Sequence, residues 1–303
     1  MDAFYIILTA TLIALSCGLL GCLLILRRMA MVGDAISHAV LPGIVLAFLI
    51  SGTRDSFWMM GGAALLGIFT TFLIEFFHKR ARLQTDAAIG VTFTWLFALG
   101  IILISVFAGQ VDLDQECVLY GEIAYVPLDL WITASGRILG PRALYIAGLV
   151  LMINATFLYA GYKELLLTTF DPTFAASIGI SISLWNYLLM GAVSMTTVAS
   201  FESVGAILVV ALLVAPPATA YLLTDRFPAL LATTAGLAVA ISTGGYYLAV
   251  WLDGSIAGAI VTVAGVLFGL AFLFAPRHGL LSRRWQQRRH RQALAEAAAR
   301  HRE

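Results

Sequence analysis

The chain has 303 residues, of which 61% are hydrophobic and 12% are charged, with a formal net charge of +1 at pH 7. A soluble domain carries about 25% charged residues, so this composition excludes an ordinary soluble protein and indicates a polytopic membrane protein. Segments of roughly ten residues with alternating polarity, which are typical of a transmembrane β-barrel, are absent from the sequence. We therefore expect an all-α helical bundle embedded in membrane lipid.

Nine apolar runs are long enough for helices that cross a hydrocarbon core, which takes about 20 residues. The second and sixth runs are short, so a bundle of eight spans is the alternative. The predicted spans are Phe4–Leu26, Ala35–Ile50, Phe57–Phe77, Ala88–Phe107, Ala143–Tyr162, Ile182–Val198, Ser203–Leu223, Ala229–Trp251 and Ser255–Ala275.

The basic residues predict the orientation of the bundle. If the N-terminus lies outside, all but three of the 18 Lys and Arg residues fall in cytoplasmic segments, and the exceptions are Arg54, Arg137 and Arg142. The positive-inside rule therefore selects an outer N-terminus and a cytoplasmic C-terminus.

An acid and an imidazole interrupt the second apolar run. Asp34 and His38 are four residues apart, which places both side chains on one face of a helix. A carboxylate inside a membrane costs about 2.5–3.5 kcal/mol on insertion scales, so its presence needs a reason. A carboxylate with an imidazole suits a divalent transition metal such as manganese, iron or zinc. The alternative is that His38 only packs within the bundle.

The segment Gly109–Pro141 is a long connection between the fourth and fifth predicted spans, on the predicted outer side, whereas most other connections are short. Its acidic residues include Asp112, Asp114 and Glu116. An acidic outer vestibule would raise the local concentration of cations, whereas an ordinary solvated loop explains the charges equally well. Apolar residues at Ile123–Val126 predict that part of the segment folds down onto the membrane surface.

A second break lies on the predicted cytoplasmic side, between the fifth and sixth spans. Asp171 can cap a helix that starts at Pro172, and Gly179 can end it. Phe170 and Phe174 would then be exposed unless something covers them. The sequence leaves two interpretations open, a helix on the membrane surface or a docking helix for a cytoplasmic partner.

Small residues and one acid suggest how the later spans pack. Gly254 and Gly258, and then Gly265 and Gly269, repeat at a four-residue spacing that lets helices approach closely in lipid. Glu202 is predicted to lie near the N-terminus of the seventh span, where the helix dipole favours a carboxylate.

No nucleotide-binding loop is present in the sequence. The two lysines, Lys79 and Lys163, do not follow Gly or precede Ser or Thr, as a phosphate-binding loop requires. We therefore expect no enzymatic activity in this chain, and any ATP must be hydrolysed by another one. We divide the chain into a membrane domain at 1–281 and a basic cytoplasmic tail at 282–303, and expect no nucleic-acid partner.

The run Arg27–Gly43, and especially its part Val32–Gly43, resembles the signature of permease subunits of manganese, zinc and iron ABC importers. Further segments match the family in the same order, so the resemblance covers nearly the whole chain before the tail. They are Thr85–Gly90, Val111–Glu122, Thr169–Ala175, Ser203–Ala220, Leu223–Arg226 and Phe274–Gly279.

The resemblance implies a permease of the bacterial plasma (inner) membrane that carries Mn²⁺, Zn²⁺ or Fe²⁺ and binds none permanently. It implies a second permease subunit, identical or different, a dimer of cytoplasmic ATPase subunits and an extracytoplasmic metal-binding protein. By the same resemblance, Asp34 and His38 are pathway residues, and the stretch Asp171–Gly179 is the coupling helix that inserts into the ATPase. The acidic segment Asp112–Glu116 resembles the manganese and iron branch more than the zinc branch.

Two other classes of function compete with this interpretation. An ion-coupled secondary transporter needs no ATPase, but such proteins usually show inverted repeats and more ionisable groups at the midplane, and neither is evident here. A purely structural membrane subunit would be indifferent to the loss of Asp34.

Overall fold

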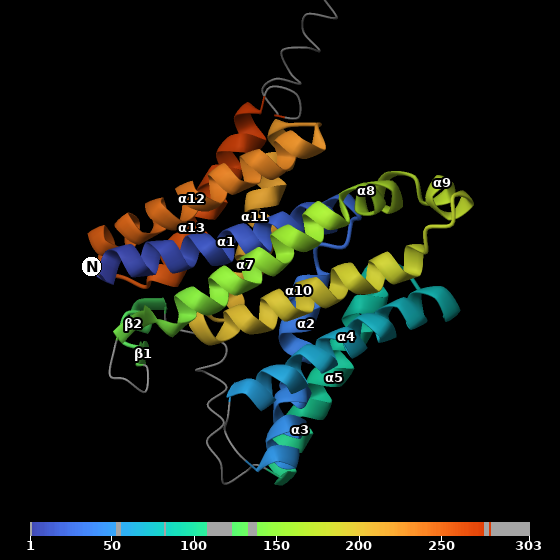
Figure 1. The fold of residues 1–303 in the computed structure, drawn as a ribbon, viewed down its shortest axis with the longest axis horizontal. Coiled ribbons are helices and arrows are strands. Elements are labelled where there is room, and N and C mark those ends of the chain that lie inside the picture. Colours follow the sequence, from blue (N-terminus) through green and yellow to red (C-terminus); the bar gives the residue numbers. More distant parts are fainter. Residues whose placement is uncertain are drawn as a thin grey trace, which may run out of the picture.

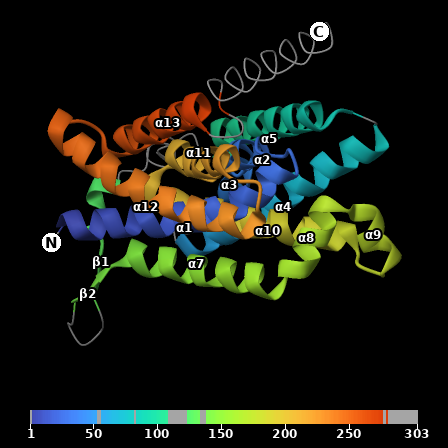
Figure 2. The same cartoon turned by 90° about the horizontal axis from the view of Figure 1, so that it is seen from above.

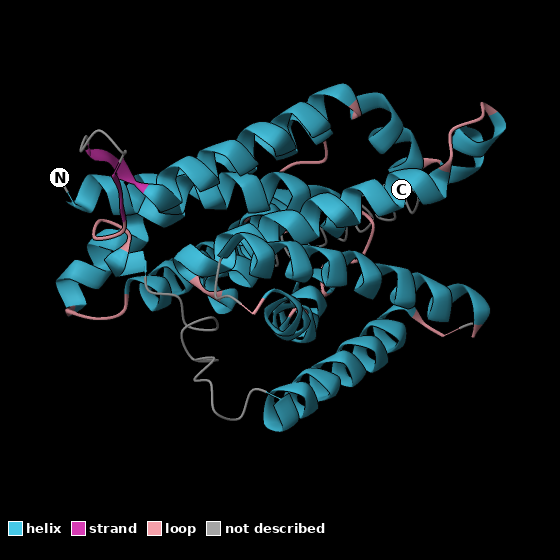
Figure 3. Cartoon of the chain, turned by 60° about the horizontal axis from the view of Figure 1, so that its bottom comes forward, coloured by secondary structure: helices cyan, strands magenta, loops and turns pink. Residues whose placement is uncertain are grey.

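The computed structural model describes residues 2–52, 56–81, 83–107, 123–132, 138–275 and 279. Almost all the described segments are helical (Figure 3). The helices are α1 (Asp2–Leu26), α2 (Val32–Ala39), α3 (Leu41–Ser51), α4 (Ser56–Arg80), α5 (Thr85–Phe107), α7 (Arg142–Ala160), α8 (Tyr162–Phe170), α9 (Pro172–Ser177), α10 (Ile182–Val204), α11 (Ala206–Leu223), α12 (Phe227–Leu252) and α13 (Ile256–Phe274).

Nine spans in the described part of the chain are long and apolar enough to cross a membrane. This confirms the predicted all-α bundle and favours nine spans over the alternative of eight. The second span consists of α2 and α3, which are separated at Val40. Pro42 has no N–H to donate to the carbonyl of His38 four residues earlier, which explains an interruption at this point.

The bundle is organised around α1, which packs against α7, α10, α11 and α12. Helices α12 and α13 lie on one side of α1, while α3, α4 and α5 form a group on the other side of α10 (Figure 1). Helix α2 links the two groups, since it contacts α4 and α5 as well as α10 and α11.

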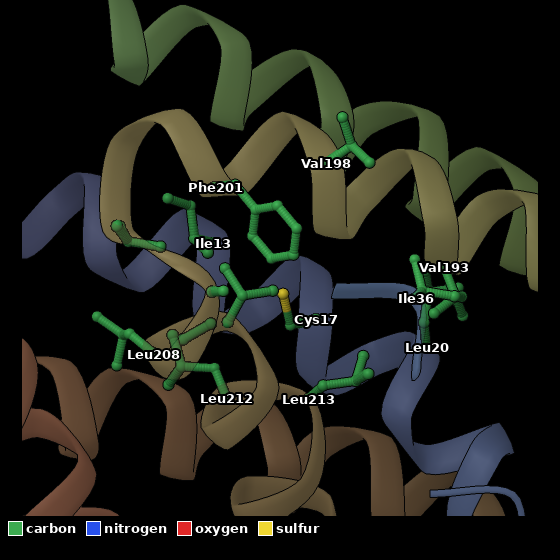
Figure 4. Packing of buried hydrophobic residues seen from close by; sticks show 14 of the residues in the cluster. Ile13, Cys17, Leu20, Ile36, Val193, Val198, Phe201, Leu208, Leu212 and Leu213 are labelled. Carbon is green, nitrogen blue, oxygen red and sulfur yellow. The ribbon is translucent and has the colours of Figure 1, made fainter. Parts of the chain in front are cut away.

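Apolar side chains from distant segments fill the centre of the bundle (Figure 4). Cys17 and Leu20 of α1, Ile36 of α2 and Leu212 of α11 are fully buried there. Ile36 lies in the turn between Asp34 and His38, so burial of this one side chain fixes which face of α2 turns away from the core.

Two glycines allow α3 and α4 to touch through their backbones. A Cβ added at Gly62 would lie 2.5 Å from the Gly43 carbonyl oxygen and 2.6 Å from the Ala47 Cβ. The sequence suggested instead that close helix contacts form at Gly265 and Gly269, and that expectation is wrong within this chain. At Gly265 and Gly269, a Cβ would meet nothing within 4 Å.

We expect Gly62→Ala to destabilise the bundle by about 1–3 kcal/mol relative to Gly61→Ala, because the new methyl group must push α3 away. Gly61 is the matched control, since a Cβ there meets nothing within 4 Å and the gain in helix propensity is the same. Thermal unfolding of both purified variants in one detergent measures the difference. Equal melting temperatures would show that α3 and α4 do not touch at Gly62.

The segment before α7 forms a short 3-10 helix, η1 (Ile123–Tyr125), and an antiparallel pair of strands, β1 (Leu130–Ile132) and β2 (Ile138–Pro141). The sequence did not predict this hairpin. Ile123 and Val126 are buried in the core, and η1 contacts α1 and α13. The apolar stretch thus packs onto helices of the bundle, and the prediction that it folds down onto the membrane surface is wrong for these two residues.

The links that follow α1, α7 and α11 meet at one end of the bundle. Arg27 contacts Thr168 and Thr169 of α8, and the rings of Tyr162 and Phe227 are 5.7 Å apart. Strands β1 and β2 lie at the opposite end with the N-terminus (Figure 2). The predicted cytoplasmic links thus share one end of the bundle, and the predicted outer segments share the other, as the positive-inside rule requires. Which side of the membrane each end faces stays a prediction.

Glu202 is a correction to the sequence analysis. Helix α10 continues to Val204 and α11 begins at Ala206, so Glu202 lies in the last turn of α10 and not in the first turn of the following span. A carboxylate is unfavourable at a helix C-terminus, and the helix dipole therefore does not account for this residue.

Candidate metal site and coupling segment

Helix α2 brings Asp34 and His38 together, as their spacing predicts. The Nε2 atom of His38 lies 3.6 Å from Oδ1 of Asp34, and both side chains are a little over one third exposed. The pair therefore stands on the surface of the single chain, within a membrane-spanning segment. Buried neighbours on the same helix, Ala35 and Ile36, hold the opposite face of α2 against the core.

The imidazole of His38 is oriented by two aromatic rings of α5. Its centroid lies 5.8 Å from that of Phe93 and 5.7 Å from that of Phe97, which it meets edge to face. Such contacts restrict the rotation of the ring while one side of His38 stays open. His38 thus both packs within the bundle and keeps its Nε2 atom beside a carboxylate.

A complete metal site is not assembled within the described part of the chain. No group of three or more His, Cys, Asp or Glu side chains comes together among the residues that could be searched. One oxygen and one nitrogen donor are half of the four ligands that zinc usually takes. A metal ion held by this pair would need further ligands from outside the residues that were searched.

The segment 170–179 forms the short helix that the sequence predicts. The Asp171 carboxylate caps α9 by accepting hydrogen bonds from the Phe174 backbone N–H at 3.0 Å and from the Thr173 hydroxyl at 2.7 Å. These bonds hold the pKa of Asp171 below its usual value, because they favour the charged carboxylate. The cap therefore stays charged at neutral pH, and its stabilising effect is lost only when the pH falls through this lowered pKa.

Gly179 ends the segment, again as predicted. Its φ of +86° is in the left-handed region, its N–H donates to the Ala176 carbonyl, and the Ile180 N–H donates to the Ala175 carbonyl. This pair of bonds is a Schellman motif. Both ends of α9 are thus fixed by local hydrogen bonds.

The outer surface of this segment is apolar and uncovered in the chain. Phe170 is 60% exposed and Phe174 is 50% exposed, whereas Ala175 is buried and α9 contacts α8 and α10. Helix α9 projects from the end of the bundle beyond α8 (Figures 1 and 2). Two exposed phenylalanines on a well-capped helix at that position are typical of a surface that a partner covers.

The predicted acidic vestibule cannot be placed. Asp112, Asp114 and Glu116 lie outside the described residues. The two sites that can be placed are separate features, since the Asp34–His38 pair lies within a span and segment 170–179 lies beyond the ends of α7 and α10.

Sequence reasoning missed the role of Arg27. It counted Arg27 only as a charge that orients the chain, whereas the guanidinium bonds side chains of α8 and α10. No signal in the sequence links Arg27 to partners more than 140 residues further along the chain.

Comparison with known proteins identifies the same architecture. The model of the ABC 3 transport family matches residues 3–275. The chain is 47% identical to the manganese transport system membrane protein MntD of Bacillus subtilis, over 92% of this chain and 94% of that protein. It is 45% identical to the zinc transport system membrane protein TroD of Treponema pallidum, over 92% of this chain and 75% of that protein.

A solved structure agrees with the computed fold. PsaBC from Streptococcus pneumoniae, determined in complex with a Fab, has a chain that superposes with a TM-score of 0.72 at 30% sequence identity. The match covers 90% of this chain and 91% of that one. The predicted family resemblance is thereby confirmed over nearly the whole described bundle.

Proposed function

The chain belongs to the ABC 3 transport family, and from that membership we propose that it is the permease of an ATP-driven importer for a divalent transition metal, manganese first and zinc or iron next. It is a multi-pass protein of the bacterial plasma membrane and a transport subunit. In the proposal, ATP is hydrolysed by a dimer of separate cytoplasmic subunits, and an extracytoplasmic metal-binding protein delivers the ion.

The observation that carries this proposal is the Asp34–His38 pair. The Asp34 Oδ1 and His38 Nε2 atoms, which could both bind a metal, are 3.6 Å apart within a span. Both side chains are more than one third exposed on the surface of one chain. An exposed carboxylate would be costly against lipid. A second permease placed against this face would remove that cost and bring a second Asp and His, so four ligands would surround an ion on the axis between the subunits.

The ligands of the proposed site do not by themselves select manganese. Carboxylate oxygens suit manganese, while imidazole suits zinc, iron and copper as well, so a mixed set admits several metals. The manganese and zinc relatives are almost equally similar to this chain, at 47% and 45% identity. The preference therefore rests on the acidic sequence at Asp112–Glu116, which belongs to the manganese and iron branch by resemblance.

Segment 170–179, called the docking segment from here on, is proposed to seat in a groove of the ATPase subunit. Support comes from its two exposed phenylalanines and from the hydrogen bonds that fix both ends of α9. A rigid helix loses little conformational entropy on binding, so it transmits the movements of a partner directly. On this proposal, the end of the bundle that carries α8 and α9 faces the cytoplasm.

Uptake into proteoliposomes tests the function. The permease, its ATPase and its metal-binding protein are reconstituted, and radiolabelled manganese, zinc and iron(II) are supplied separately with ATP or with a non-hydrolysable analogue. We expect ATP-dependent accumulation, fastest for manganese. Equal accumulation with ATP and with the analogue would identify an ion-coupled secondary transporter. No accumulation of any of the three metals would refute the proposal.

A further inference from the structure

Arg27 joins the end of α1 to both flanks of the docking segment. Its Nε donates to the Thr169 hydroxyl and its Nη2 to the Thr168 hydroxyl, each at 2.9 Å, and its Nη1 donates to the Asn186 side-chain carbonyl. Thr168 and Thr169 directly precede Phe170, and Asn186 lies near the start of α10, which follows the segment. One half-buried side chain thus holds the docking segment on both sides.

A stiff turn connects Arg27 to the helix that bears the metal ligands. Arg28 has φ +59°, its N–H donates to the Ile25 carbonyl, and the Met29 N–H donates to the Leu24 carbonyl, which is a Schellman motif. The Val32 N–H then donates to the Met29 carbonyl, and α2 begins. Hydrogen bonds donated by Arg28, Met29 and Val32 fix this turn, so we expect a displacement of the guanidinium to be passed on to α2.

The connecting turn has space to move. A cavity of about 320 Å³ lies beside it, and its lining includes Arg27, Met29 and Val32 together with Glu75, Asn186 and Met190. Protein interiors are close-packed, so an element surrounded on all sides resists displacement. A turn that faces a cavity can shift without overlapping its neighbours.

The chemistry of the contacts suits a switch. All three acceptors are neutral, two hydroxyls and an amide, so none of these three groups becomes an unpaired charge when the guanidinium moves away. The three bonds leave from three different nitrogens of one planar group, whereas a lysine would have to make all of its bonds from a single nitrogen. The arrangement therefore favours arginine at this position.

We propose that Arg27 is a positioning residue that couples the docking segment to α2, so that movement imposed by the ATPase reaches Asp34 and His38. This inference rests on the proposed function. It predicts that transport and ATP hydrolysis become separable when the guanidinium is removed.

The test compares Arg27→Gln with wild type in proteoliposomes that hold the complete transporter. ATP hydrolysis and manganese uptake are measured in the same vesicles, and their ratio is the readout. We expect the ATPase to co-purify with the variant at wild-type stoichiometry. The manganese transported per ATP should fall by roughly fivefold or more, which is the lower end of the effects that coupling between two sites usually has. A merely structural contact would lower the melting temperature and leave this ratio unchanged.

Arg80→Gln is the matched control, because it removes the same charge from an exposed residue at the end of α4, outside the connecting turn. Its ratio should stay at the wild-type value, and equal losses in both variants would show that charge alone matters. Should Arg27→Gln fail to fold, the double variant Thr168→Val with Thr169→Val removes two of the acceptors instead. A wild-type ratio of manganese to ATP in Arg27→Gln or in the double threonine variant overturns the inference. Failure of both variants to assemble also overturns it, because Arg27 would then be needed only for folding.

Failure of the proposed function gives a different result. If the wild-type complex binds no ATPase or moves no metal, the fault lies with the proposed function. The inference about Arg27 is tested only where the wild-type complex transports metal, and it then fails if the variants keep the wild-type ratio, if the control loses as much, or if neither variant assembles.

Discussion

Asp34→Ala is expected to reduce metal uptake by at least about 100-fold, because loss of a direct ligand should exceed the 10–100-fold effect of the groups that orient ligands. The substitution removes the carboxylate of the Asp34–His38 pair, so each altered permease contributes only an imidazole to the doubly charged ion. The fold should survive, since the side chain is 38% exposed and contributes little to the core. Radiolabelled manganese uptake in proteoliposomes measures the effect.

Two further variants separate the ligand from its surroundings. Asp34→Asn keeps the shape of the side chain but loses its charge, so we expect nearly the same loss of uptake. Ser37→Ala is the matched control on α2, because the Ser37 hydroxyl donates to the Asp34 backbone carbonyl at 2.6 Å and has no proposed metal contact. Size-exclusion chromatography checks that the permeases still pair. Wild-type uptake by Asp34→Ala would remove Asp34 from the pathway.

The double variant Phe170→Ala with Phe174→Ala is expected to weaken binding of the ATPase subunit by at least roughly 30-fold, the effect of losing one interface hot spot of about 2 kcal/mol. The two rings are the large apolar groups that the docking segment exposes at its start. The membrane fold should survive, because both residues lie outside the spans. Co-purification and titration of the ATPase against the detergent-solubilised permease measure the change.

Two comparisons make this result specific. Asp171→Ala should act more mildly, since it removes the cap of α9 and leaves both rings in place. Trp251→Ala truncates an aromatic residue that is 80% exposed at the far end of α12, and it should leave ATPase binding unchanged. If the double variant binds its ATPase at wild-type stoichiometry and affinity, the docking surface lies elsewhere, and Leu83–Gly90 is the next candidate.

The parts of the candidate sites that the sequence predicted are local ones. Residues four apart on a helix share a face whatever surrounds it, so the proximity of Asp34 and His38 follows from their spacing. The cap at Asp171 and the left-handed turn at Gly179 likewise depend on a few adjacent residues. The ligands that would complete the metal site are not local, and spacing along one chain gives no information about them.

The sequence by itself determined that the chain is a bundle of eight or nine apolar spans, because crossing a bilayer requires a run of apolar residues that is visible in any single segment. Only the tertiary structure decided which faces of those helices meet. In lipid, nearly every face of a helix is apolar, so the pattern does not mark the buried one. For that reason the repeat at Gly265 and Gly269 was misleading, while the contact between Gly43 and Gly62 and the bonds of Arg27 to Thr168, Thr169 and Asn186 emerged only from the folded bundle.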